Sequence, residues 1–128
     1  MWRLRVFGVA FWLALLAPVA SADSVDLVLA EAQFNKSCGT CHVAAPDAGP
    51  RQGPNLFGVV GRSAGAVEGF KYSPAFVAGH DGIVWDDATL DRWLADPQSV
   101  IPGAVMLYKQ TDPEKRRLVI EYLKTGAN

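Results

Sequence analysis

Two cysteines and a histidine lie within five consecutive residues, Cys38-Gly39-Thr40-Cys41-His42, in the first third of the chain. Thiols at this spacing are one helical turn apart and can form thioether bonds to the two vinyl groups on one haem edge. The imidazole beside the second thiol then lies under the iron and can serve as its proximal ligand. The motif therefore predicts one haem c, attached covalently through Cys38 and Cys41, with His42 on the iron.

Three other chemistries use similar residues, so the motif alone leaves alternatives. A thioredoxin-like dithiol starts a helix that follows a strand, whereas here a helical pattern precedes the cysteines. A zinc site needs more ligands, and after residue 22 the only other histidine is His80. A disulfide between Cys38 and Cys41 is the third alternative. Haem attachment is favoured because it accounts for both thiols and His42 together.

A second iron ligand is sought among the remaining methionine and histidine. Met106 is the only methionine after residue 22, and it follows a Pro-Gly turn at Pro102-Gly103. A single methionine often only fills a core, but here the haem motif favours ligation, and a His/Met pair raises the reduction potential. His80 lies between two glycines and is predicted to be an exposed turn residue. We therefore expect His42 and Met106 to be the axial ligands.

The first 22 residues predict export. They hold 17 hydrophobic residues, two arginines and no acid, and end in the small-residue pattern Ala20-Ser21-Ala22. This pattern predicts a signal peptide at 1–22 and a soluble periplasmic bacterial domain at 23–128, with an uncleaved membrane anchor as the alternative. Residues 23–128 contain 10 basic and 13 acidic residues, a balance that argues against a nucleic-acid partner.

Three helical patterns predict an all-α fold. They run from about Ser24 to Ser37, from Asp86 or Asp87 to Pro97, and from Thr111-Asp112-Pro113-Glu114 toward the C-terminus. The inward faces are predicted to hold Leu27, Ala30 and Phe34, then Leu90, Trp93 and Leu94, then Leu118, Val119, Tyr122 and Leu123. The long connections between them are rich in glycine and proline. Because such loops need something to pack against, the haem is expected to fill the middle.

Further segments resemble class I cytochromes c, especially mitochondrial cytochrome c and bacterial cytochrome c2, from about Ala30 to Thr125. The segments that carry this resemblance are Phe34, Gly53-Pro54-Asn55-Leu56, Gly58 to Arg62, Gly69-Phe70 with Tyr72, Gly82-Ile83-Val84-Trp85, Asp96-Pro97, Ile101-Pro102-Gly103 with Met106, and Tyr122-Leu123-Lys124. The resemblance implies the class I cytochrome c fold, in which three main helices and irregular loops surround one covalent haem.

The same resemblance implies roles for individual residues. The carbonyl of Pro54 would accept a hydrogen bond from the His42 ring and fix the imidazole. Arg62, Tyr72 and Trp85 would surround the haem propionates. The side chains of Phe34 and Tyr122 would pack where the first and last helices cross.

The sequence departs from the family at several positions. Ala104 replaces a threonine that often binds a propionate, Trp93 replaces a tyrosine that often bonds the methionine sulfur, and Ala30 replaces a glycine at the helix crossing. The segment from Tyr72 to Gly82 is two residues longer, so propionate contacts within residues 73–81 are not assigned. Positions that are often lysines around the haem edge are here Ser37, Gln98 and Val105, which leaves Lys36, Lys71 and Lys109 for a partial basic ring.

The sequence as a whole predicts a monomeric one-electron carrier that is not an enzyme. Its expected partners are periplasmic or membrane-bound redox proteins, such as a cytochrome bc-type complex, a terminal oxidase, a reaction centre or a dehydrogenase. Both a respiratory and a photosynthetic role are compatible with the residues. The alternative function is a haem c protein with a labile sixth ligand that acts as a peroxidase or as a gas or redox sensor.

Overall fold

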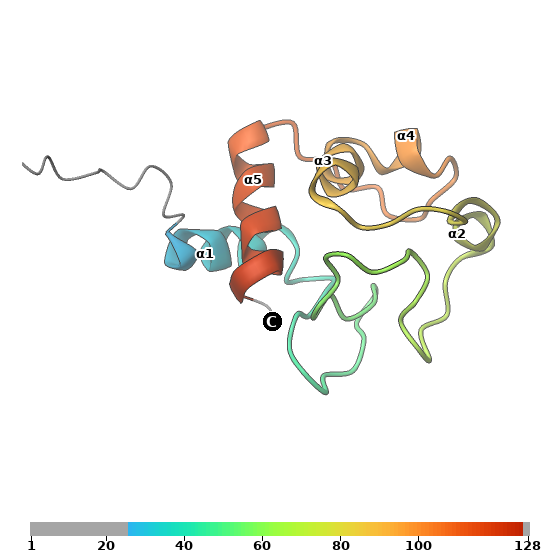
Figure 1. The fold of residues 1–128 in the computed structure, drawn as a ribbon, viewed down its shortest axis with the longest axis horizontal. Helices are drawn as coiled ribbons and strands as arrows, with labels where there is room; N and C mark the ends of the chain where they lie inside the picture. The colour runs from blue at the N-terminus through green and yellow to red at the C-terminus, as the bar shows by residue number, and fades with distance from the viewer. Residues whose placement is uncertain (1–25, 127–128) are drawn as a thin grey trace, which may run out of the picture.

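The computed structural model describes residues 26–126, and the predicted signal peptide therefore lies outside the described residues. The helices are α1 (Leu27–Ser37), α2 (Pro74–Gly79), α3 (Asp87–Ala95), α4 (Pro97–Val100) and α5 (Pro113–Glu121), which continues into a π-helical turn at Tyr122–Gly126. Residues 26–126 form no β-strand, and their only bridge pairs Ser63 with Val84. The predicted all-α class is confirmed (Figure 1).

Helix α1 begins later than predicted because Asp26 caps it. The Asp26 carboxylate accepts hydrogen bonds from the backbone N–H groups of Val28 and Leu29, at 2.9 and 3.4 Å. Ala30 and Phe34 are buried as expected, but Leu27 is 46% exposed, so its predicted place in the core is wrong. The reason is that the first turn of α1 extends beyond the helices that cover its later turns (Figure 1).

Helices α3 and α5 start where the capping residues predict. The Asp86 carboxylate accepts from the Thr89 N–H at 2.7 Å, and Asp112 accepts from Glu114 N–H at 2.9 Å, with Pro113 at the first helical position. The inner face of α3 is as predicted and holds Leu90, Trp93 and Leu94. The inner side of α5 is formed by Val119 and Ile120, and Leu123 in the following π-helical turn is also buried, whereas Leu118 is only partly buried.

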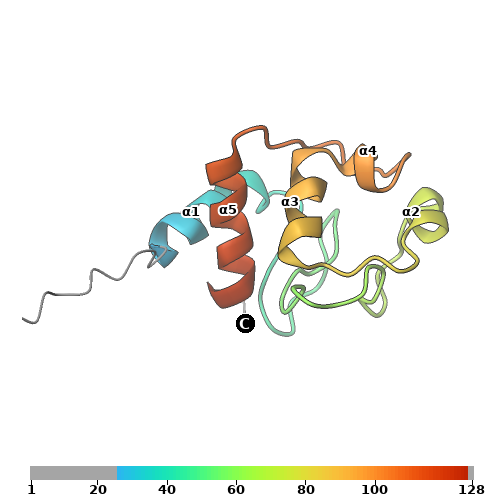
Figure 2. The ribbon, with the colours of Figure 1, turned by 45° about the horizontal axis from the view of Figure 1, so that its top comes forward.

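Helix α5 lies between α1 and α3 and contacts both of them (Figure 2). On the α1 side, the rings of Phe34 and Tyr122 pack with centroids 4.8 Å apart, which confirms the predicted crossing. Ala30 is completely buried there. On the α3 side, Arg116 Nε lies 2.7 Å from an Asp91 carboxylate oxygen. These contacts fix α1, α3 and α5 relative to one another, and the central loops pack against these helices.

Two short helices, α2 and α4, were not predicted. Each has a capping residue followed by proline at the first helical position, Ser73-Pro74 for α2 and Asp96-Pro97 for α4. This arrangement pre-organises one helical turn, so the signal was present in the sequence. Helix α2 accommodates part of the longer 72–82 segment.

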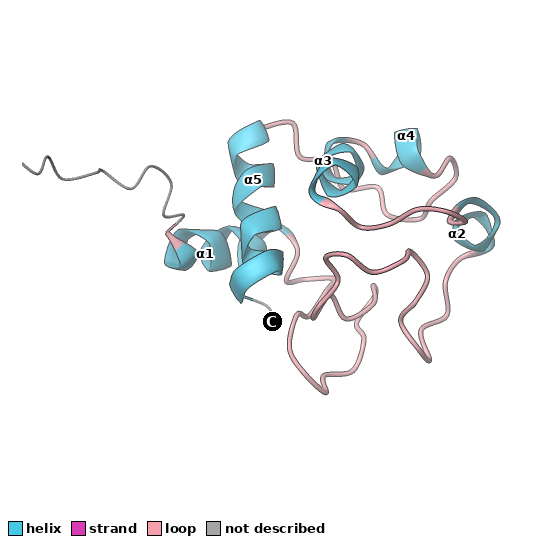
Figure 3. Cartoon of the chain, viewed as in Figure 1, coloured by secondary structure: helices cyan, strands magenta, loops and turns pink. Residues whose placement is uncertain are grey.

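The chain between α1 and α2 is irregular (Figure 3). Hydrogen bonds within the loop replace the missing secondary structure: the Asn55 side-chain amide donates to the carbonyls of Ala45 and Ala48 at 2.7 and 2.9 Å. The N–H of Gly53 donates to the Cys41 carbonyl at 2.8 Å. These bonds fix residues 53–55 directly beside the cysteine motif. In residues 26–126, no helix has the length and apolar character needed to cross a membrane.

Candidate haem-binding site

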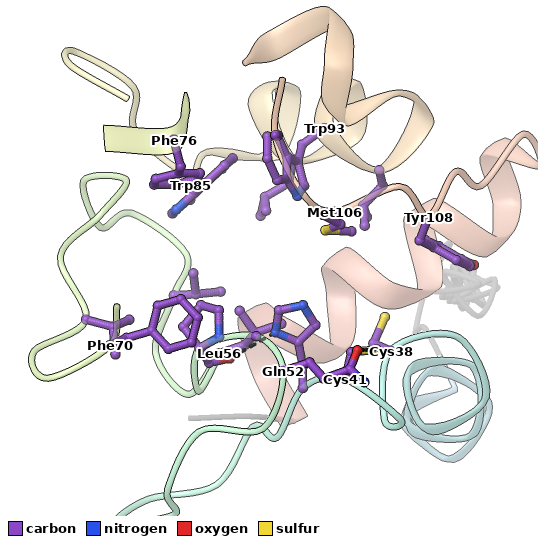
Figure 4. A pocket seen from close by; sticks show the side chains of 18 of the residues that line it. Cys38, Cys41, Gln52, Leu56, Phe70, Phe76, Trp85, Trp93, Met106 and Tyr108 are labelled. Atoms are coloured by element: carbon purple, nitrogen blue, oxygen red, sulfur yellow. Dashed lines mark hydrogen bonds between the residues drawn. The ribbon is translucent and has the colours of Figure 1, made fainter. Parts of the chain in front are cut away.

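An apolar cavity of about 720 Å³ lies between the central loops and helices α3 and α5 (Figure 4). The structure brings all eight predicted site residues to its wall. They are Cys38, Cys41, His42, Pro54, Arg62, Tyr72, Trp85 and Met106. Figure 4 shows Cys38, Cys41 and Leu56 on one wall, with Met106 and Trp93 facing them from the other. A flat apolar group can therefore be enclosed between these two walls.

The cysteine motif continues helix α1 as a turn. The N–H of Cys38 donates to the Phe34 carbonyl at 2.7 Å, and the N–H of His42 donates to the Cys38 carbonyl at 2.8 Å. The two thiols thus lie about one turn apart on the cavity wall, the separation that two vinyl groups on one haem edge require. The Cys41 thiol also donates to the side-chain oxygen of Gln52 at 3.2 Å.

The surroundings of the cysteines do not suit the alternative chemistries. The sulfur atoms of Cys38 and Cys41 are not joined to each other in a disulfide. Burial, with a smaller contribution from Cys41, raises the pKa of Cys38 to about 12, whereas a reactive dithiol needs a lowered pKa. Within residues 26–126, no three side chains of the His, Cys, Asp and Glu types gather at one place.

The His42 ring is held in one orientation. Its Nδ1 lies 2.9 Å from the Pro54 carbonyl oxygen, the hydrogen bond that the family resemblance implies. Burial lowers the pKa of His42, only partly opposed by this bond, and so favours the neutral form of the ring. A neutral imidazole that donates from Nδ1 leaves the Nε2 lone pair available for iron.

Gly53 is needed because the His42 ring occupies the space of a side chain. A Cβ at Gly53 would lie 2.1 Å from His42 Cε1, closer than any real contact. In the sequence Gly53 stands out only as part of the Gly53-Pro54-Asn55-Leu56 motif, and its spacing does not predict this contact.

The segment that carries Met106 is held by Gln98. The Gln98 amide nitrogen donates to the Ala104 carbonyl at 2.7 Å, and its oxygen accepts from the Gly103 N–H at 2.9 Å. Gln98 therefore acts as a clamp on the turn that precedes Met106. A lysine at this position could donate to the Ala104 carbonyl but could not accept the bond from Gly103.

The guanidinium of Arg62 lacks a partner at the cavity. Its Nη2 atom is buried and makes no hydrogen bond with the described residues. Arg62 as a whole is only partly buried, but a buried nitrogen of a cation without a partner is costly, so an anion beside Nη2 would stabilise the site. Near it, the Tyr72 hydroxyl accepts from the Val67 N–H at 3.2 Å and keeps its own proton for donation. A cofactor that is apolar except for carboxylates at one edge, as haem is, fits these residues.

His80 differs from the sequence prediction. It is not fully exposed: its ring stacks on Phe76 with centroids 5.8 Å apart, and about a quarter of the side chain is accessible. The ring does not line the cavity. Phe76 and Gln52 do line it, and sequence reasoning missed both. The Ser73-Pro74 helix start could have revealed Phe76, whereas nothing in the sequence singles out Gln52.

Similarity to known proteins agrees with this geometry. No protein-family model matches the chain. The chain is 40% identical to cytochrome c-550 of Novispirillum itersonii over 103 residues, which cover 73% of this chain and 93% of that protein. It is 37% identical to cytochrome c2 of Rhodomicrobium vannielii over 123 residues, which cover 95% and 97%. The chain belongs to the class I cytochrome c family.

A solved structure shows the same fold. Cytochrome cH from Methylobacterium extorquens superposes with a TM-score of 0.69 at 37% identity, covering 79% of this chain and 99% of that one. As a class I cytochrome c, the protein carries one covalent haem c through Cys38 and Cys41 and is an electron-transfer protein rather than an enzyme.

Proposed function

We propose that this cytochrome is a soluble periplasmic carrier that moves single electrons, with His42 and Met106 as the two axial ligands. The observation that supports this most directly is the placement of Met106 on the cavity wall opposite the cysteine motif (Figure 4). Bound haem c supplies a one-electron Fe(III)/Fe(II) couple. With His42 and Met106 both bound to the iron, the chain would leave no site on the metal for a substrate.

The surrounding residues keep the site unchanged between the two oxidation states. Pro54 holds the His42 ring through the bond at Nδ1, and Gln98 holds the turn before Met106. Trp85, Trp93 and Leu94 are buried and exclude water from the α3 side. A rigid, dry site keeps the reorganisation on electron transfer small. Arg62, Tyr72 and Trp85 are proposed to receive the propionates.

Spectroscopy of the haem-loaded protein tests the ligands. The oxidised protein should be low-spin and show the weak far-red band of a Met–Fe(III) bond. Met106→Ala should abolish the band and lower the potential by on the order of 100 mV, because the thioether favours Fe(II). Val77→Ala, at an exposed site on α2, is the control and should change neither. A high-spin wild-type protein that rapidly binds added ligands would disprove the carrier function.

We also propose that residues 1–22 are removed on export and that the carrier works between membrane-bound or periplasmic redox proteins. The apolar run with Arg3 and Arg5 before it supports export, and the relatives named cytochrome c2 support a carrier role. Mass spectrometry of the exported protein should give a chain that begins at Asp23. Recovery of the intact chain in the membrane fraction would instead establish an anchor.

A further inference from the structure

The mouth of the haem cavity carries two exposed apolar side chains. Val105 is 76% exposed and Leu107 is 75% exposed, and they flank Met106 on both sides. Both also line the opening of the cavity. We call this pair the apolar collar. Its place beside the iron ligand makes it part of whatever surface a redox partner must approach.

Little positive charge surrounds the collar. Among the described residues that line the cavity, Lys36 is the only lysine, and the one arginine, Arg62, is proposed to face the propionates. Lys109, two residues after Leu107, is paired with Asp96 at 3.0 Å, so its charge is largely compensated. Gln98 is neutral and uses its side chain to bind the Gly103–Ala104 backbone. The cavity mouth therefore offers an acidic partner few cations.

From this arrangement we infer that the collar is a docking surface for a redox protein whose own contact patch is apolar and nearly uncharged. The inference rests on the proposed carrier function and names the kind of partner for that same site. Charge complementarity carries the choice of partner: an acidic patch would lose water and find little opposite charge in return. An apolar patch gains by covering Val105 and Leu107.

The size of the collar suits a carrier. Two side chains provide a small contact, and small contacts are typical of short-lived electron-transfer complexes. Because the attraction is apolar rather than ionic, docking should depend little on salt. The complex would thus form and separate quickly at any ionic strength.

Voltammetry of the haem-loaded protein on gold coated with alkanethiols tests this inference. One coating ends in methyl groups and imitates an apolar partner, and the other ends in carboxylates and imitates an acidic partner. Electron exchange should be faster on the methyl coating and almost unchanged between low and high salt. Val105→Ser and Leu107→Ser should each lower the electroactive coverage on methyl about tenfold, which corresponds to about 1.4 kcal/mol.

Val28→Ser is the matched control, because Val28 is 75% exposed on α1, away from the cavity, and should leave the coverage unchanged. Val105→Lys should shift the preference toward the carboxylate coating and introduce salt dependence. Faster, salt-sensitive exchange of the wild type on carboxylate would overturn the inference, as would equal losses in Val28→Ser and Leu107→Ser. A mediated titration in solution separates the two proposals: absence of a reversible one-electron couple there would refute the carrier function itself.

Discussion

The side chain of Gln98 binds the carbonyl of Ala104 at 2.7 Å, two residues before Met106. The same side chain accepts from the Gly103 N–H, so one amide satisfies a donor and an acceptor of the turn. In this chain the Gln98 side chain is bound to the backbone of residues 103 and 104, and this contact couples α4 to the turn that precedes Met106.

Gln98→Lys is expected to loosen the Met106 turn. The ammonium group can donate to the Ala104 carbonyl but cannot accept from Gly103, so the free energy of unfolding should fall by about 1 kcal/mol. The far-red Met–Fe(III) band should also fade at a lower temperature than in the wild type. Ser99→Lys adds the same charge at the next, exposed position and should keep the band. Equal behaviour of the two variants would show that Gln98 is not a clamp.

Gly53→Ala is expected to displace the His42 ring. The added methyl group would lie 2.1 Å from Cε1, so the ring or the backbone must move and the bond to Pro54 must lengthen. We expect a strong loss of low-spin haem protein, measured from the visible spectrum and the yield of covalent haem. Gly49→Ala is the control, because no atom lies within 4 Å of a Cβ there. Normal spectra for both variants would contradict the predicted crowding.

Arg62→Met is expected to lower the reduction potential. Removing a positive charge near the haem favours Fe(III). We expect the potential to fall by about 20–60 mV, because 59 mV corresponds to a tenfold change in the equilibrium constant of a one-electron couple. Arg62→Lys keeps the charge but loses the planar guanidinium, so its reduction potential should lie between those of the wild type and Arg62→Met. Potentiometric titration measures all three. A potential that is unchanged in Arg62→Met would place the propionates elsewhere.

The Asp86 cap should make helix α3 sensitive to acid. Hydrogen bonds from the backbone and then the side chain of Thr89 lower the pKa of the Asp86 carboxyl. As pH falls, the unfolded chain therefore takes up this proton before the folded chain does. The contribution of the Asp86 carboxylate to the free energy of unfolding is complete above the pKa in the unfolded chain, and it is lost as pH falls through the pKa in the folded chain.

Asp86→Asn separates this charge effect from capping itself, because asparagine also caps but does not titrate. Thermal unfolding followed by circular dichroism should give a lower midpoint for Asp86→Asn at pH 7, by a few degrees, and matching midpoints near pH 2.5. A constant difference across this range would mean that the carboxylate charge contributes nothing. Asp86→Ala has no capping side chain, so its unfolding midpoint should be lower than that of the wild type at both pH values.

The sequence predicted most of what depends on local chemistry. Capping at Asp86 and Asp112, the packing of Phe34 on Tyr122 and the bond between His42 and Pro54 all agree with the structure. Each of these follows from residue type and spacing, or from a family motif that lies in register.

The remainder depends on three-dimensional packing, which spacing alone does not encode. Leu27 has the periodicity of a core residue, yet the described residues leave it 46% exposed in the first turn of α1. His80 has the neighbours of an exposed turn, yet it stacks on Phe76 because the unpredicted helix α2 places the two rings together. The pairing of Lys109 with Asp96 is likewise set by how the ligand loop folds back on α3 and α4.

The crossing of α1 and α5 also sets the order of assembly. Residues 34 and 122 meet across almost the whole chain, so this contact forms only after the last helix has been synthesised. In the closed fold Cys38 is buried in the same core as Val119 and Leu123. The same residue lines the haem cavity, so the core that α5 closes and the wall that holds the first thiol are one structure. Docking of the last helix and filling of the cavity by haem should therefore stabilise each other.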